Sequence, residues 1–282
     1  MALTKVLVTV MTYPTLSRKH IETVCTAGFR EDGSWIRIFP VPHRLLWKYD
    51  IMPYSKWQWI EADLERNKKH DNRPESYHIR DINTLKILER IDISGKPNWT
   101  LRKSWIFKRK EIFNNMTEMI NLTKQNKISL AVLKPSEILD LIIEPVDMQK
   151  YRENLASIKA KYEAEQQQTN LFENKTDFDD NFSFAEKIPY KFRYKFRTED
   201  GKVRTIMIED WELSQLYRKY SNNEQEAISK VKEKYMKIAK ERDIYLFMGT
   251  YYEWQKKNAL DPYLIIGVFY PPKEDASQLS LF

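Results

Sequence analysis

Residues 190–197 alternate strictly between aromatic and cationic side chains, in the order Tyr-Lys-Phe-Arg-Tyr-Lys-Phe-Arg. Successive side chains of a β-strand point to opposite faces, so this pattern predicts a strand with one aromatic face and one cationic face. We expect the aromatic rings to lie in a core. An outer cationic face is either simply solvated or able to follow a phosphate backbone.

The first 85 residues carry the same kind of signal. Alternating or β-branched runs over 5–12, 22–29, 35–39 and 57–65 predict strands. Asp32-Gly33 lies between two of these runs and predicts a hairpin turn, because glycine supplies the positive φ that a tight turn demands. This region is therefore expected to form a small antiparallel sheet or barrel.

The middle of the chain is more helical, and the last third returns to β structure. Apolar residues at helical spacing predict a helix within 101–123, and helix-forming residues predict another over 148–167. Later, 211–217 and 225–242 are expected to be helical, with core strands at 244–248 and 263–270.

The polar stretch 166–182 is rich in Asn and Asp and predicts a linker, where we place the domain boundary. The expected fold class is α+β, with two small curved-sheet or OB-like β-barrel domains joined by helices. The predicted segments are a β-rich domain at 1–85, a helical segment at 86–165, the linker at 166–182, an α+β domain at 183–272 and a tail at 273–282.

Composition narrows the classes of function. Only six glycines occur in 282 residues, which argues against a fold that cradles nucleotide phosphates. The formal charge of +7 suits a polyanionic partner such as DNA. Cys25 is the one cysteine, expected to be a small buried hydrophobe, and with four histidines and no CxxC motif we expect neither metal nor cofactor.

The sequence shows no signal peptide and no stretch of ~20 apolar residues, so no membrane span is expected. Because a single cysteine cannot form an internal disulfide, the cytoplasm is the expected compartment. Association with the nucleoid is expected because DNA is an expected partner.

The tail ends in Gln278-Leu279-Ser280-Leu281-Phe282. Large apolar groups at a chain end contribute little to stability unless a core or a partner receives them. This pentapeptide resembles the motif by which polymerases and repair proteins dock on the bacterial β sliding clamp. The resemblance implies that Gln278, Leu281 and Phe282 are anchors, Leu279 a supporting contact and Ser280 a permissive position. The alternative is a tail that packs on its own domain.

A weaker copy of the motif lies at Gln168-Thr169-Asn170-Leu171-Phe172, which lacks leucine at the second position. It is either a second docking peptide, which would add avidity, or a linker with two apolar residues. The strand texture of 23–42 and 264–272 also resembles prokaryotic proteins with paired OB-like domains from phage–host conflict systems.

Two groups of cations are candidates for contacting DNA. The first group lies in the N-terminal region and the second on the alternating strand and its hairpin partner. Their members are Arg18, Lys19, Arg37 and Arg44, and Lys191, Arg193, Lys195, Arg197 and Arg204.

Four carboxylates are candidates for catalysis: Asp71 and Glu75 in a polar loop, and Glu209 and Asp210 before a helix. Acids before a helix also suit capping and the helix dipole. The leading hypothesis is a clamp-recruited DNA-binding protein acting in replication-associated repair or phage defence. The alternatives are a clamp-targeted nuclease or DNA glycosylase, and a clamp inhibitor.

Overall fold

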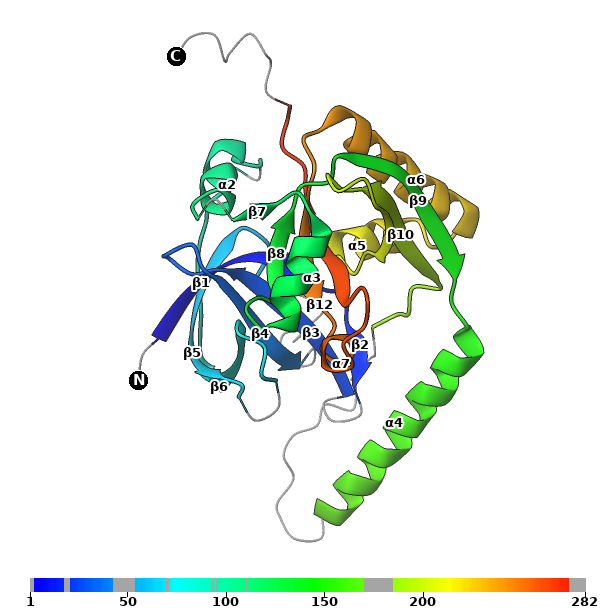
Figure 1. The fold of residues 1–282 in the computed structure, drawn as a ribbon. Helices are drawn as coiled ribbons and strands as arrows, with labels where there is room; N and C mark the ends of the chain where they lie inside the picture. Colours follow the sequence, from blue (N-terminus) through cyan, green and yellow to red (C-terminus); the bar gives the residue numbers. More distant parts are fainter. Residues whose placement is uncertain are drawn as a thin grey trace, which may run out of the picture.

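The structure is a computed structural model that describes residues 3–17, 21–42, 54–68, 71–92, 94, 96–109, 111–169 and 185–273. The fold class is α+β, as expected, with two β-rich units packed side by side (Figure 1). Of Ser17, Ile21, Pro42 and residues 162–169 only the backbone is described.

The first unit is a curved sheet that closes on itself. Its strands are β1 (Leu3–Met11), β2 (Thr15–Ser17), β3 (Ile21–Phe29), β4 (Trp35–Pro42), β5 (Gln58–Arg66) and β6 (Ser76–Arg90). β1 pairs antiparallel with both β3 and β5, and β4 pairs parallel with β6, which closes the sheet into a small barrel. Gly33 adopts a φ of 82° in the β3–β4 hairpin, which confirms the predicted turn.

The second unit contains two sheets and the longer helices. Its elements are β7 (Ile112–Phe113), α3 (Met116–Lys124), β8 (Leu130–Leu133), β9 (Glu137–Pro145), α4 (Met148–Thr169), β10 (Tyr190–Arg197), β11 (Val203–Met207), α5 (Trp211–Lys219), α6 (Glu224–Glu241), β12 (Tyr245–Thr250), α7 (Tyr252–Lys256) and β13 (Tyr263–Phe269). One sheet has the order β11-β10-β9 and the other β13-β12-β8-β7. A parallel bridge between Ile208 and Ile265 joins them into a second, partly closed barrel.

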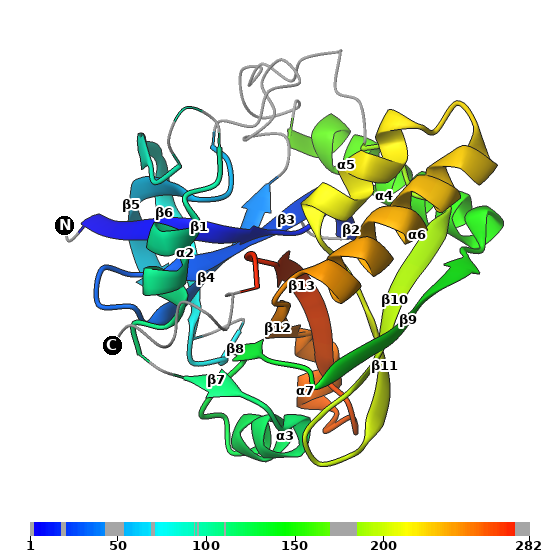
Figure 2. The same ribbon diagram turned by 90° about the horizontal axis from the view of Figure 1, so that it is seen from above.

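The alternation at β10 is confirmed. Phe192, Tyr194 and Phe196 are at most 2% exposed, whereas Lys191 and Lys195 are exposed. The Tyr194 hydroxyl donates to the Tyr235 carbonyl of α6, at 2.9 Å. In Figure 2, α5 and α6 lie along one face of this sheet, while α4 projects from the body in Figure 1.

A shared apolar layer joins the two units. Val6 and Val8 of β1 belong to the cluster inside the first barrel, whereas Leu7 and Val10 belong to a cluster that extends into the second unit. That layer combines residues of both units: Leu7, Val10, Ala27, Phe29, Trp57, Leu130, Val132, Phe247, Leu264, Ile266 and Phe269. One strand thus contributes to two cores, and the outer wall of the first barrel is covered by the β13-β12-β8-β7 sheet.

Two sequence predictions require correction. The predicted boundary at 166–182 is wrong, because β9 and β10 lie on either side of it and pair in one sheet, with Phe192 opposite Ile143. The segment 86–165 is not purely helical. It begins in β6, and β7 interrupts the helix expected over 101–123, leaving α2 (Trp99–Ile106) and α3. The units meet instead near residues 109–112.

Barrel closure predicts the effect of a substitution at Gly28, which pairs with Val8 of β1. A Cβ at this position would lie 1.9 Å from the backbone oxygen of Leu7, and neither strand can move aside without breaking the ladder. Gly28→Ala should lower the free energy of unfolding by about 3 kcal/mol or more, the upper end of overpacking costs.

Chemical denaturation of the purified protein measures this loss. Gly201→Ala is the matched control, because nothing lies within 4 Å of its Cβ position and only its φ of 74° opposes the change. The control should lose about 1–2 kcal/mol. Equal losses for the two variants would refute a special requirement at Gly28.

Candidate functional site

Arg37 is the cationic residue of β4, and its side chain is buried, with 2% of the residue exposed. Its side chain reaches out of the first barrel to the start of β8, where Nη1 donates to Ser129 Oγ at 2.7 Å and Nη2 to the Ser129 carbonyl at 3.1 Å. Burial and the nearby Arg73 lower the pKa of Arg37. A guanidinium in this position cannot contact a phosphate backbone, so the DNA-binding role predicted for Arg37 is wrong.

The loop between β5 and β6 supplies a second buried cation with its own partner. Arg73 donates Nε to Asp71 Oδ1 at 2.8 Å and Nη2 to Asp71 Oδ2 at 2.5 Å. Its Nη1 donates to the Thr250 carbonyl of β12, at 2.5 Å. Burial raises the pKa of Asp71, but hydrogen bonding and the charge of Arg73 outweigh it, so the net shift is downward.

Glu75 ends the same loop and also reaches the second unit. It accepts from the Ser129 backbone N–H at 2.9 Å and from Ser129 Oγ at 2.5 Å. Ser129 therefore contacts both Arg37 and Glu75, and it links β4 and the β5–β6 loop to β8. Sequence reasoning missed Ser129 and Thr250, because only the packing of the two units brings them to these partners.

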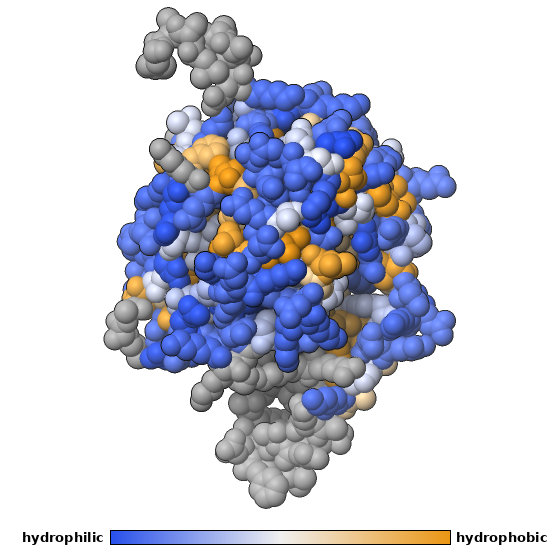
Figure 3. Space-filling view, in the orientation of Figure 1, coloured by the Kyte–Doolittle hydropathy of each residue, from blue (hydrophilic) through white to orange (hydrophobic). Residues whose placement is uncertain are grey.

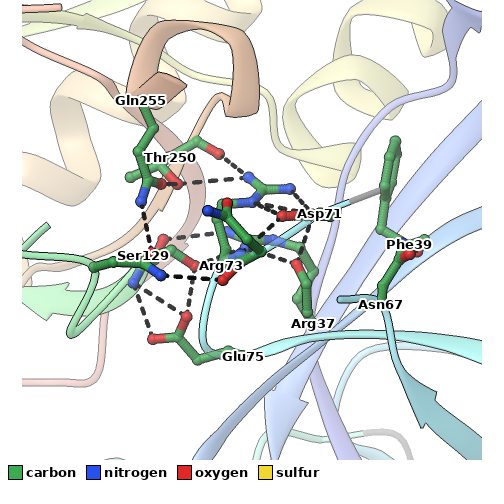
Figure 4. Close-up of polar contacts among 12 residues, drawn as sticks. Arg37, Phe39, Asn67, Asp71, Arg73, Glu75, Ser129, Thr250 and Gln255 are labelled. Carbon is green, nitrogen blue, oxygen red and sulfur yellow. Dashed lines mark hydrogen bonds and ion pairs between the residues drawn. The ribbon is translucent and has the colours of Figure 1, made fainter. Parts of the chain in front are cut away.

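We call Arg37, Asp71, Arg73, Glu75, Ser129 and Thr250 the interdomain polar cluster (Figure 4). Two cations and two anions balance, and each charged group has a hydrogen-bond partner. Buried charges are tolerated only when they are paired in this way. Glu75 thus joins the units directly, whereas Asp71 holds Arg73, which contacts Thr250 of the second unit. The cluster therefore connects the two units rather than presenting free reactive groups.

The other carboxylate pair lies at the start of α5. Asp210 is 1% exposed, accepts from the Glu212 N–H at 3.0 Å and forms a 2.5 Å ion pair with Lys56 of the first unit. Burial lowers the pKa of Lys56, but Asp210 and Glu212 outweigh it, so the net shift is upward. Asp210 is therefore a helix cap and a second interdomain contact, which agrees with the capping interpretation.

Glu209 is half-buried and lies near two lysines. Burial raises its pKa, against the opposing charges of Lys187 and Lys191. The Cys25 thiol likewise has its pKa raised by burial, which is unlike an activated nucleophile.

The cations on β10 and β11 are partly neutralised. Arg193 pairs with Glu144 at 3.0 Å, Arg197 with Glu137 at 3.7 Å and Arg204 with Asp261 at 2.5 Å. Lys191 and Lys195 are exposed and form no ion pair with any described residue. This face therefore offers fewer free charges than its sequence suggests.

Several predicted residues lie outside the described part of the chain. These are Arg18, Lys19, Arg44, most of the motif at 168–172, and the tail anchors Gln278, Leu279, Leu281 and Phe282. Within the described ranges, no cluster of three or more His, Cys, Asp or Glu residues is placed to share a metal ion. None of the helices described is long and apolar enough to cross a membrane.

A cleft of about 680 Å³ lies between the β3–β4 hairpin and the α3–β8 region. Its walls combine apolar and charged side chains from both units, among them Trp35, Glu75, Arg109, Phe113, Glu118 and Lys127. Because the lining residues come from both units, the cleft depends on how the units pack, and the sequence contains no local signal for it.

The polar cluster predicts a pH-dependent stability. Because the pKa of Asp71 is lowered by folding, its contribution is present above the unfolded value of 3.8 and is lost as the pH falls through the lower folded value. Asp71→Asn should cost about 3–5 kcal/mol near neutral pH, and the cost should shrink in acid.

Denaturant titrations at neutral and acidic pH measure both effects. Asp261→Asn removes a carboxylate from a partly exposed arginine pair and should cost about 1 kcal/mol or less. A pH-independent loss in the Asp71 variant would contradict the assignment.

Comparisons with known families agree with the two-unit division. Residues 2–108 match a family described as "Domain of unknown function (DUF8758)", and residues 112–282 match "Domain of unknown function (DUF8757)". The junction between the matches coincides with the boundary set by strand pairing. No curated protein matches the chain. Because the second match covers more than half of the sequence, this protein belongs to the DUF8757 family.

Proposed function

We propose that this protein docks on the bacterial β sliding clamp through Gln278–Phe282 and binds DNA there, in replication-associated repair or phage defence. The observation that carries the proposal is the terminal pentapeptide, which matches the clamp-docking pattern at every position. A short peptide that must be ordered on binding gives modest, reversible affinity, which suits recruitment to a moving ring.

The barrels support the DNA-binding half of the proposal. OB-like barrels commonly bind oligonucleotides through one face and the loops beside it. The charge of +7 favours association with a polyanion, and Lys191 and Lys195 on β10 remain exposed. The resemblance to paired OB-like proteins of phage–host conflict systems is the basis for including phage defence.

The geometry favours a binding protein over a clamp-targeted nuclease or glycosylase. Asp71, Glu75 and Asp210 are all engaged by partners within the fold. A general acid or base needs a carboxyl group that can reach substrate, and these three are occupied by hydrogen bonds and ion pairs inside the protein. A clamp inhibitor differs from our proposal in needing no affinity for DNA.

Calorimetric titration into purified β clamp tests the docking. We expect micromolar-range binding by the full chain. The double variant Leu281→Ala/Phe282→Ala should weaken it by roughly 100-fold or more, because two buried apolar side chains each contribute at least about 1.5 kcal/mol.

Ser280→Ala is the matched control, since it alters the permissive position of the same peptide, and it should bind as the unaltered protein does. Undiminished binding by the double variant would transfer the docking role to another surface. No binding by the unaltered protein would refute the proposal.

A further inference from the structure

The connection between β12 and β13 presents aromatic and apolar side chains to solvent. Tyr251 is 49% exposed, Trp254 40% and Leu260 86%. An isolated exposed apolar residue needs no explanation, but here two aromatic rings lie together with centroids 5.2 Å apart. The proposed docking function does not use this group, and it contributes little to either core.

This connection is held rigidly. The Tyr251 N–H donates to the Pro262 carbonyl at 2.9 Å, which closes the base of the connection, and the Ala259 N–H donates to the Trp254 carbonyl at 2.9 Å. Thr250 Oγ1 donates to Gln255 Oε1 at 2.7 Å. The rings are therefore presented in a fixed geometry, and binding to them costs little ordering entropy.

The interdomain polar cluster also contacts the connection between β12 and β13. Arg73 lies over the ring of Tyr252 at 5.3 Å and donates to the carbonyl of Thr250, the last residue of β12 and two residues before α7. On the other side, Gln255 Nε2 donates to Asn126 Oδ1 at 3.3 Å, so α7 is joined to the turn after α3. The helices α3 and α7 lie side by side in both ribbon views (Figures 1 and 2).

Four lysines lie on the two segments that the Gln255–Asn126 hydrogen bond joins, one of which carries the aromatic pair. Lys256 and Lys257 follow it at the end of α7, and Lys124 and Lys127 lie at and after the end of α3. All four are exposed, and none forms an ion pair with a residue in the described ranges.

The β12–β13 connection carries fewer unpaired acidic side chains than lysines. Asp261 is paired with Arg204, which leaves Glu253 as the acidic residue of α7. The surroundings of the rings therefore carry a net positive charge. The face that includes α7 is largely hydrophilic in Figure 3, with apolar residues in small separate patches.

We propose that Tyr251 and Trp254 form a stacking platform for bases of single-stranded DNA, with Lys124, Lys127, Lys256 and Lys257 contacting its phosphates. Exposed rings beside unpaired cations are the combination by which proteins hold single strands without reading sequence. Paired bases in a duplex keep their faces stacked on one another, so only an unpaired strand can use the rings. The inference deepens the proposed DNA-binding function and rests on it for the choice of DNA.

Fluorescence anisotropy with a labelled oligothymidylate, and with a duplex of the same length, tests the platform. The unaltered protein should bind the single strand more tightly than the duplex. Trp254→Ala should weaken single-strand binding roughly fivefold or more, whereas Trp254→Phe keeps a ring and should retain most of the affinity. Both variants alter an exposed side chain, and thermal unfolding should confirm that they fold.

The lysines are tested by salt dependence. Lys256→Ala/Lys257→Ala should reduce the slope of log affinity against log salt by about 1.4, since each phosphate contact to a single strand contributes about 0.7. Lys234→Ala/Lys237→Ala on α6 makes the same charge change at exposed positions on another element, and should leave the slope unchanged.

The outcomes separate the two proposals. Binding of DNA with no preference for single strands and no effect of Trp254→Ala would overturn the platform alone. Tighter binding of an oligouridylate would overturn DNA as its ligand. Failure to bind any DNA would overturn both the platform and the DNA-binding half of the proposed function, while clamp docking is measured separately through the tail variants.

Discussion

The packing of this protein depends on one buried contact, the guanidinium of Arg37 held against Ser129. A buried cation is costly unless it is hydrogen-bonded, and the partners of Arg37 lie on the other unit. Arg73 of the first unit likewise donates to the Thr250 carbonyl of the second unit. The Glu75 carboxylate of the first unit accepts a hydrogen bond from Ser129. Separating the barrels would leave Arg37 and Glu75 without their hydrogen bonds to Ser129, which makes separation costly.

The apolar layer beside the interdomain polar cluster also holds the two units together. β1 is buried on both faces, with Val8 inside the first barrel and Leu7 in the layer between the units. The barrel wall that packs here is not available to a ligand. Among the described residues, two surfaces outside this interface are the cleft beside Trp35 and the exposed connection that carries Trp254. Both owe their shape to the closed interface.

The packing of the two units explains several charged residues that the sequence suggested for catalysis or DNA binding. Asp71, Glu75 and Arg37 are polar residues of the kind that active sites use. Arg37 and Glu75 bond to Ser129 of the other unit, and Asp71 bonds to Arg73. In the proposal, the tail at Gln278–Phe282 gives location and the platform at Tyr251 and Trp254 gives a grip on unpaired strands. A rigid pair of barrels would keep the platform at a constant distance from the point where the tail begins.

The sequence by itself determined the local elements, because side-chain periodicity and turn chemistry act between near neighbours. The strand of alternating residues at 190–197, the turn at Gly33 and the helix cap at Asp210 were all readable in this way. Tertiary structure alone decided which strands pair across residues 166–182, whether Arg37 faces solvent or Ser129, and which aromatic residues stay exposed. These properties depend on contacts between residues far apart in the chain, whose free energy exists only once both barrels have closed and packed.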